Sequence, residues 1–295
     1  MRRDRPLVSV YIPTRDRVEL LTRAIRSVLL QDYGPLEILV VDDASADATR
    51  QRVADLAAEC ASGRRIAYFR QSTPAGANSA RNRALAAAAG ELVTGLDDDD
   101  YFLPDRISRL VAAFDPARAA FVFDGYVRET HLADGRVRRA NITLDRPARL
   151  RDLLKRNIVG NQVLTLTSRL RQVGGFDERL PAWQDYDLWL RLVKTFGDGL
   201  PGGGCSYVHT IDSARGRISD GTEKVERAFD LFLEKHPEYA DADLQLCLRL
   251  AKACYGVEAV TVADLPRLLL LGEPRYVLFA LYSFLSRRGS RSRRS

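Results

Sequence analysis

The sequence has 295 residues, 46% of them hydrophobic and 28% charged, which excludes an intrinsically disordered chain and leaves enough length to bury a core. The net charge of +6 is modest, and residues 287–295 carry five arginines and no acid. A nucleic-acid-binding protein is more often basic along its whole length, so we expect no nucleic-acid partner and an anionic surface near the C-terminus instead.

Roughly the first hundred residues are predicted to alternate strands and helices. Apolar or β-rich runs predict strands at residues 7–12, 36–41, 66–70 and 92–96. A capping box of Asp16 and Glu19 is expected to begin a helix after the first strand, and residues 80–89 form another predicted helix that Gly90 ends. This alternation predicts an α/β fold with a doubly wound, mostly parallel, Rossmann-like sheet.

The second part of the chain has a different pattern. The expected elements are a helix opened by Pro104, a strand at 119–127, an antiparallel hairpin around Asp134-Gly135 within 126–142, a strand at 163–167, a turn at Gly174-Gly175, a helix at 186–196, a loop at 200–204 and helices from about 222 onward. We therefore expect a helical C-terminal extension after the α/β domain.

Polar and acidic side chains follow three of the predicted strands, at the sheet edge where open α/β sheets bind ligands. The most acidic group is the run Asp97 to Asp100. Neighbouring carboxylates repel one another, and Asp97 and Asp99, at alternate positions, suit Mg²⁺ or Mn²⁺ completed by diphosphate oxygens. A solvated acidic loop is the alternative, but the run lies between an apolar strand and a helix, where a ligand site is more typical.

The other polar groups at this edge are less specific. Asp42 and Asp43 either cap the next helix or accept hydrogen bonds from a nucleoside. Arg70 and Arg81 either bind phosphate or lie on the surface. Neither G-x-x-x-x-G-K-[ST] nor G-x-G-x-x-G occurs, which disfavours ATPases and NAD enzymes. A metal and a diphosphate without a phosphate loop favour a reaction in which the diphosphate leaves.

Several motifs in order along residues 7–195 resemble the family 2 glycosyltransferases. They are Val8 to Arg17, Glu37 to Ser45, Ala80-Arg81-Asn82 with Ala89-Gly90-Glu91, Leu96 to Asp100 with Pro104, Gly174 to Glu178, and Asp185 to Leu192. The resemblance implies a GT-A type fold over residues 1–215, with a nucleotide-sugar half at about 1–105 and an acceptor half at about 106–215. Residues 216–295 then form the helical region with the basic tail.

The resemblance also implies roles for single residues. The expected donor-binding residues are Pro13, Thr14, Arg15, Asp42, Asp43, Arg81, Asp97 and Asp98, and the expected metal ligands are Asp97 and Asp99 of the D-x-D element. Thr14 and Asp43 would hold the nucleoside, most often uridine. Asp185 would be the general base in an inverting displacement.

The acceptor side carries open alternatives. Gln184 stands where the family commonly has Glu, and Gln cannot act as a base. Asp187 is a competitor for that role, and Asp185 could instead only cap its helix. Trp183, Gln184 and Asp187 are expected to bind the acceptor, with Trp183 either stacking on a sugar or packing in the core.

The expected function is metal-dependent, inverting sugar transfer from a nucleoside-diphosphate sugar, most often a UDP-sugar, to a glycan or lipid-linked acceptor in bacterial surface polysaccharide synthesis. A sugar-phosphate nucleotidyltransferase is the first alternative, although its Gly-rich loop after the first strand is missing. A non-catalytic nucleotide- or carbohydrate-binding module is the second, and the presence of Asp185 argues against it.

The C-terminal region leaves its partner open. The apolar runs at 268–271 and 276–285 fall short of the ~20 residues that span a bilayer. Either they and the basic tail lie on an anionic membrane, or a helix packs on the catalytic domain. The four cysteines form no C-x-x-C pair and no secretory signal is recognisable, which predicts a cytoplasmic protein, with the inner face of the plasma membrane and a homodimer left open.

Overall fold

The computed structural model describes residues 5–212, 222–254 and 264–270. The chain forms two compact units. The first comprises residues 1–150, 158–179 and 184–216, and the second comprises residues 151–157, 180–183 and 217–295. Two short segments from the middle of the chain therefore belong with the C-terminal region, which the sequence pattern did not indicate.

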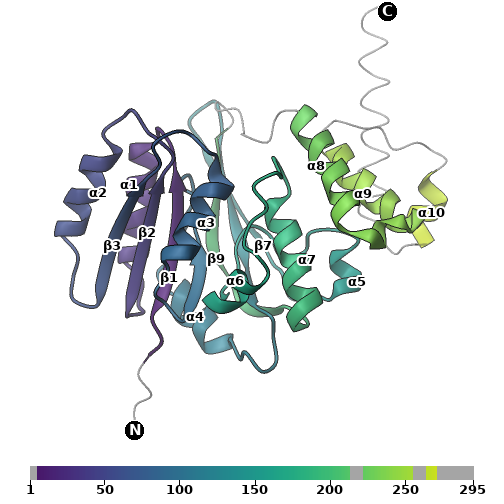
Figure 1. Cartoon of the computed structure of the whole chain (residues 1–295), viewed down its shortest axis with the longest axis horizontal. Coiled ribbons are helices and arrows are strands. Elements are labelled where there is room, and N and C mark those ends of the chain that lie inside the picture. The colour runs from purple at the N-terminus through teal and green to yellow at the C-terminus, as the bar shows by residue number, and fades with distance from the viewer. Residues whose placement is uncertain (1–4, 213–221, 255–263, 271–295) are drawn as a thin grey trace, which may run out of the picture. The chain divides into compact units, whose positions relative to one another are not determined.

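A five-stranded sheet forms the centre of the first unit (Figure 1). Its strands are β1 (Val8–Thr14), β2 (Leu36–Asp42), β3 (Arg64–Arg70), β4 (Leu92–Gly95) and β8 (Thr165–Leu166), in the order β3-β2-β1-β4-β8. The first four pair in parallel, and β8 pairs with β4 in the antiparallel direction. Every residue of β1 and β2 is buried, as expected for strands covered on both faces.

Six helices in the described part of the chain belong to the first unit. They are α1 (Val18–Leu29), α2 (Thr49–Ala58), α3 (Ala77–Ala87), α4 (Arg106–Ala113), α6 (Thr167–Gln172) and α7 (Gln184–Phe196). The helix α3 packs on β1 and β2, and α2 packs on β3. Apolar residues one helical turn apart on α1, among them Leu21, Ile25 and Val28, are fully buried against the strands. The doubly wound α/β prediction is confirmed.

A second sheet contains β5 (Tyr101–Phe102), β6 (Val122–His131), β7 (Val137–Ile142) and β9 (Leu200–Asp212), in the order β5-β9-β6-β7. The predicted hairpin is confirmed, since Tyr126 pairs with Ile142 and Gly135 turns with a φ of 81°. The predicted loop at 200–204 is wrong because these residues begin β9. Its register against β6 shifts around Gly125, where a Cβ atom on Gly125 would lie 2.9 Å from the backbone oxygen of Gly204.

Two smaller predictions for the first unit are also wrong. Asp16 does not form a capping box: the N-cap of α1 is Arg17, and the Asp16 carboxylate accepts a hydrogen bond from the backbone of Ala46 in the neighbouring loop. The strand expected at 163–167 shrinks to Thr165–Leu166, because Thr167 begins α6. In both places the residue makes a contact with a distant part of the chain, and this contact overrides the structure that the local sequence pattern indicated.

The described part of the second unit is mostly helical. It contains α8 (Thr222–Lys235), the 3₁₀ helix η1 (Pro237–Ala240), α9 (Ala242–Cys254) and α10 (Leu265–Leu270), while α5 (Leu150–Leu153) lies at the junction of the two units in the chain. Phe232 of α8 packs against His236, Tyr239 and Trp183. The described residues contain no helix long and apolar enough to cross a membrane. The apolar segment at 276–285 and the arginine-rich tail lie outside the described residues.

Candidate active site

The loops after β1 and β2 are joined at the carboxyl edge of the sheet. The backbone amide of Asp16 donates to Ser45 Oγ at 2.9 Å, and both Asp16 and Ala44 have a positive φ, of 53° and 64°. Non-glycine residues rarely adopt this backbone, so contacts such as the Asp16–Ser45 hydrogen bond are needed to hold the two loops. Pro13 is buried in β1, whereas Arg15 is exposed and pairs with its neighbour Asp16 at 3.6 Å.

The two aspartates after β2 have different surroundings. Asp42 is 0% exposed, and its oxygens bind the backbone of Ser45 and the hydroxyl of Tyr68. Asp43 is 6% exposed and accepts hydrogen bonds from the backbone amides of Ala75 and Gly76, at 2.7 and 2.9 Å. Both carboxylates therefore shape loops at the sheet edge, and Asp42 presents no surface to a ligand.

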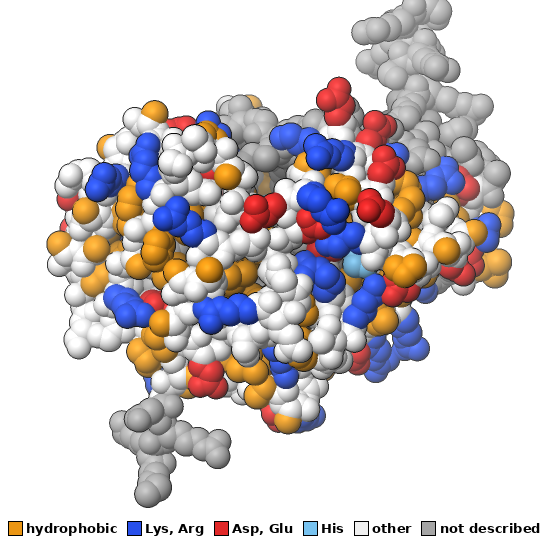
Figure 2. Space-filling model, viewed as in Figure 1, with side chains coloured by type: hydrophobic (Ala, Val, Ile, Leu, Met, Phe, Trp, Pro, Cys, Tyr) orange, Lys and Arg blue, Asp and Glu red, His pale blue; other side chains and the backbone are white. Residues whose placement is uncertain are grey.

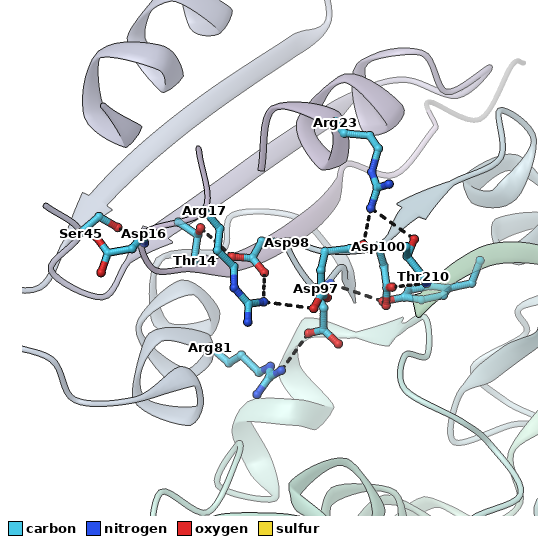
Figure 3. A network of polar contacts seen from close by, with 12 residues as sticks. Thr14, Asp16, Arg17, Arg23, Ser45, Arg81, Asp97, Asp98, Asp100 and Thr210 are labelled. Atoms are coloured by element: carbon cyan, nitrogen blue, oxygen red, sulfur yellow. Dashed lines mark hydrogen bonds and ion pairs between the residues drawn. The ribbon is translucent and has the colours of Figure 1, made fainter. Parts of the chain in front are cut away.

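The four consecutive aspartates alternate in exposure. The Asp97 and Asp99 side chains are 23% and 45% exposed, while Asp98 and Asp100 are buried. Asp98 accepts a hydrogen bond from Thr14 Oγ1 at 2.8 Å, which ties the run to the end of β1. Asp100 accepts from the Tyr207 hydroxyl at 2.7 Å and the Thr210 amide at 2.8 Å, which ties it to β9 (Figure 3). The accessible carboxylates are the two at alternate positions.

Crowding makes these carboxylates hard to ionise. Burial raises the pKa of Asp98 to about 6, although Arg17 beside it lowers the value. Burial and the Asp97 charge raise the pKa of Asp99, and burial with the Asp99 charge raises the pKa of Asp100 well above its usual range. Arg17 reaches Asp98 at 3.0 Å and Asp99 at 3.1 Å. The site holds more negative charge than its own arginines relieve, which favours a bound cation.

Arg81 from α3 pairs with Asp97 at 2.8 Å (Figure 3) and lies within electrostatic reach of Asp185. It is 5% exposed and lies over the Phe176 ring at 5.4 Å. Burial lowers the pKa of Arg81, but the charges of Asp97 and Asp185 raise it overall. The fold therefore brings together, around one buried guanidinium, two carboxylates that are 88 positions apart in the sequence.

Asp185 lies in the first turn of α7 and is half-buried, and its Oδ1 atom is enclosed without a hydrogen-bond partner among the residues that the structure describes. Burial raises its pKa to about 7, against the lowering effect of Arg81 and with a further increase from Asp97. An unbonded carboxylate oxygen whose pKa is near neutrality is suited to accept a proton. The helix begins at Gln184, so Asp185 is not the N-cap.

The other residues expected on the acceptor side have surroundings that differ from those of Asp185. Asp187 is 0% exposed and forms an ion pair with Arg191, one turn along α7, at 2.7 Å. Gln184 is half-buried at the start of the helix. Trp183 belongs to the second unit, has a φ of 59° and packs edge-on against Phe232 at 5.7 Å. Trp183 is half-buried in this contact.

Three residues of the network have no signal in the sequence pattern. Arg17 lies in the β1–α1 loop, Arg23 binds the backbone oxygen of Asp99 and Thr210 Oγ1, and Tyr207 of β9 binds Asp100 (Figure 3). Arg17 and Arg23 are six positions apart, but the sequence contains 45 basic residues, so neither could be singled out. Figure 2 shows the same abundance, with Lys and Arg side chains distributed over the visible face between acidic ones.

The carboxylates of the site can hold a metal ion only if a bound molecule such as a diphosphate supplies further oxygen atoms. Within the described part of the chain, no three His, Cys, Asp or Glu side chains are grouped closely enough to hold a metal ion. Two accessible carboxylates, Asp97 and Asp99, are what Mg²⁺ or a similar ion commonly takes from a protein when phosphate oxygens and water complete its shell. The donor set therefore fits an ion that arrives with a diphosphate.

Comparison with known proteins places the site in a family. The profile described as glycosyl transferase family 2 matches residues 9–173. A candidate colanic acid biosynthesis glycosyl transferase of Escherichia coli K12, WcaA, is 34% identical over 246 residues, 81% of this chain and 84% of the relative. The Escherichia coli enzyme WfgD, named UDP-Glc:alpha-D-GlcNAc-diphosphoundecaprenol beta-1,3-glucosyltransferase, is 28% identical over 64% of this chain and 70% of its own.

A solved structure has the same fold. The mannosyltransferase PcManGT of Pyrobaculum calidifontis, in complex with GDP-Man and Mn²⁺, superposes with a TM-score of 0.61 at 20% identity over 95% of this chain and 87% of its own. This likeness confirms the GT-A type fold expected from the sequence.

Proposed function

The chain belongs to glycosyl transferase family 2 and is a glycosyltransferase, and we propose that it transfers a sugar with inversion from a nucleoside-diphosphate donor. The donor is a UDP-sugar, the cofactor is Mn²⁺ or Mg²⁺, and the acceptor is a hydroxyl of a glycan or lipid-linked glycan. The proposed setting is bacterial surface polysaccharide synthesis, which the names of WcaA and WfgD support.

One observation carries this proposal. Asp185, with an unbonded enclosed oxygen, lies within electrostatic reach of Asp97 through the shared Arg81, although the two carboxylates come from opposite halves of the domain. A proton acceptor beside a diphosphate site is the arrangement that a single displacement requires, because the acceptor hydroxyl must lose its proton while the diphosphate leaves.

Asp97 and Asp99 would hold the metal ion. When bound, the ion would neutralise the charge that develops on the departing diphosphate. Arg81 is placed to support the same charge, since it already binds Asp97 and is buried, where electrostatic interactions are strong. Its Nε atom has no hydrogen-bond partner in the described structure.

The proton is taken up by Asp185. Its carboxylate would accept the hydrogen of the acceptor hydroxyl, so that the oxygen attacks the anomeric carbon from the face opposite the leaving group. The raised pKa, about 7, gives the carboxylate the proton affinity that this task needs near neutral pH. Asp187 is already paired with Arg191, so we assign it to holding α7 and not to proton transfer.

The remaining predicted contacts are grouped by element. Pro13, Thr14 and Asp43 lie at the ends of β1 and β2, where the nucleoside would bind, and Arg15 is exposed in the same loop. Asp42 acts on this site only by shaping the loop after β2. Gln184 begins the helix that carries the base and would face the acceptor. For localisation we propose the cytoplasm, with peripheral contact at the inner face of the plasma membrane to reach a lipid-linked acceptor.

A panel of nucleotide sugars tests the proposal. The purified protein is incubated with each donor and Mn²⁺ or Mg²⁺, and donor hydrolysis and thermal stabilisation are measured. We expect a response to a UDP-sugar that disappears with EDTA and in Asp99→Ala. The matched control Asp32→Ala changes an exposed aspartate outside the site and should keep the full response.

Asp185→Asn separates binding from chemistry. It should keep donor-induced stabilisation while transfer falls by at least about a hundredfold, since a positioned base contributes on the order of 10²–10⁴ to the rate. Normal transfer by this variant would show that the base is elsewhere. Formation of a nucleotide sugar from a sugar phosphate and UTP would instead establish the nucleotidyltransferase, and donor binding without any turnover would establish the non-catalytic module.

A further inference from the structure

Gln162 is a buried polar residue to which neither the motifs nor the proposed mechanism assign a role. It precedes β8 and is 3% exposed. Its Oε1 accepts a hydrogen bond from the Tyr11 hydroxyl at 2.8 Å, and its Nε2 is enclosed without a hydrogen-bond partner in the described structure. A buried donor that lacks a partner is costly, so such a group in a native protein calls for a partner such as a water, an ion or a ligand.

The amide is fixed in place by its neighbours. A Cβ atom on Gly95 would lie 2.2 Å from Gln162 Oε1 and 2.3 Å from the Tyr11 ring. The ring and the amide therefore both lie directly against the backbone of Gly95, at the end of β4. Because the Tyr11 hydroxyl donates to Oε1, the Nε2 end of the amide is left as the free donor.

The surroundings of this amide are those of the candidate active site. The Tyr11 ring meets the Phe176 ring edge-on at 5.9 Å, and the Arg81 guanidinium lies 5.4 Å from the centroid of the same Phe176 ring. Arg81 binds Asp97, and the Tyr11 hydroxyl is within electrostatic reach of Asp185. One donor, Gln162 Nε2, and one acceptor, Asp185 Oδ1, are thus left unpaired around Tyr11.

We propose that Gln162 Nε2 donates a hydrogen bond to a hydroxyl of the transferred sugar and so selects among donor sugars, with Tyr11 as the residue that positions the amide. The inference rests on the proposed function. We assign the sugar as the ligand of this amide for two reasons. The strands β1 and β4, which contain Tyr11 and Gly95, lead into the residues assigned to the donor. The sugar of the donor is also joined directly to its diphosphate. The ligand class is a neutral hexose with a hydroxyl facing the amide.

Donor hydrolysis without an acceptor tests this inference, because that reaction contains no acceptor contacts. The variant Gln162→Met removes the donor and keeps most of the volume, and Tyr11→Phe removes only the hydroxyl that orients the amide. The matched control is Gln51→Met, which changes an exposed glutamine of α2. The probes are the UDP-sugar that the wild type uses best, its epimers, its monodeoxy analogues and UDP alone.

The expected result is a loss of discrimination. For one hydroxyl of the sugar, the preference of Gln162→Met for the natural donor over the analogue lacking that hydroxyl should fall roughly tenfold, the effect of one neutral hydrogen bond. Tyr11→Phe should show a smaller fall for the same hydroxyl, and the affinity for UDP alone should stay unchanged in both. Gln51→Met should behave as the wild type.

Other results would overturn the inference. Unchanged selectivity in both Gln162→Met and Tyr11→Phe would show that the amide does not contact the sugar. An equal loss of affinity for UDP and for every UDP-sugar would show a purely structural role. A selectivity change that appears only when acceptor is added would place Gln162 on the acceptor. A wild type that responds to no nucleotide sugar would overturn the proposed function itself, which is a distinguishable failure.

Discussion

Asp185→Asn should stabilise the folded protein, by an amount that depends on pH. Burial raises the pKa of Asp185 from 3.8 to about 7 in the folded chain, despite Arg81 and with a contribution from Asp97. Between these two values the folded state holds a proton that the unfolded state has lost, so the free energy of unfolding falls as the pH rises through this window. Asparagine keeps the shape of the side chain and removes the titration.

The size of the effect follows from the difference between the two pKa values. Each tenfold difference in proton affinity is worth 1.36 kcal/mol, so ionising Asp185 in the folded protein costs up to about 4 kcal/mol. The variant should therefore gain nothing from this source below pH 3.8. Above pH 3.8 the stability advantage of the variant over the wild type should grow, and above pH 7 it should level off at about 4 kcal/mol.

Urea unfolding with EDTA present, at several pH values from 5 to 8, measures this advantage. The control Asp32→Asn changes an exposed aspartate and should show no such trend. An Asp185→Asn advantage that stays constant over this range, or that shrinks as the pH rises, would refute the reasoning, because the carboxylate would then ionise as easily folded as unfolded. A stabilised protein that has also lost transfer would indicate that the strain on Asp185 is retained for catalysis.

Three further predictions concern residues of the first unit. Arg17→Gln should lower the free energy of unfolding by about 1 kcal/mol or less in EDTA and enlarge the stabilisation by Mn²⁺ in a thermal melt, because repulsion at Asp98 is then relieved by the ion alone. Glu37→Gln should cost about 2–4 kcal/mol in urea unfolding at pH 7, since the buried carboxylate accepts hydrogen bonds from two backbone amides. Burial raises the pKa of Glu37 but these and other hydrogen bonds lower it overall, so the difference should narrow as the pH falls below 4.5. Gly95→Ala should cost about 1–3 kcal/mol, because the added carbon collides with the Tyr11 ring, and a calorimetric melt would detect it.

The central sheet could be predicted because its information is local. The strands β1 and β2 are buried on both faces, so their sequences are continuous apolar runs between polar loops, and α1 buries a regular stripe of Leu21, Ile25 and Val28. The start of β9 could not be predicted in this way. Its Pro/Gly run is typical of a loop, and it becomes strand only because β6 pairs with it across a shifted register.

The sequence indicated that alternate aspartates of the run act together, but it did not show which aspartates are accessible and which hold loops together. The alternate positions of Asp97 and Asp99 indicated that these two could bind one ion, and the structure leaves both accessible. The partners that bury Asp98 and Asp100, which are Thr14 and Tyr207, lie 84 and 107 positions away. Contacts over such distances leave no periodic signal, so the structure alone shows which two carboxylates are used to hold loops together.

The sequence also could not identify the proposed base, whereas the structure distinguishes its two candidates. Asp185 and Asp187 have the same chemistry, two positions apart on one helix, and the sequence left both as candidates. A helix turns by about 200° over two residues, so the two carboxylates must point in nearly opposite directions. Asp187 points to Arg191, and the ion pair occupies it. Asp185 points to the side of Arg81 and Asp97 and keeps an unbonded oxygen. Geometry of the helix, and not residue type, therefore distinguishes the proposed base from its neighbour.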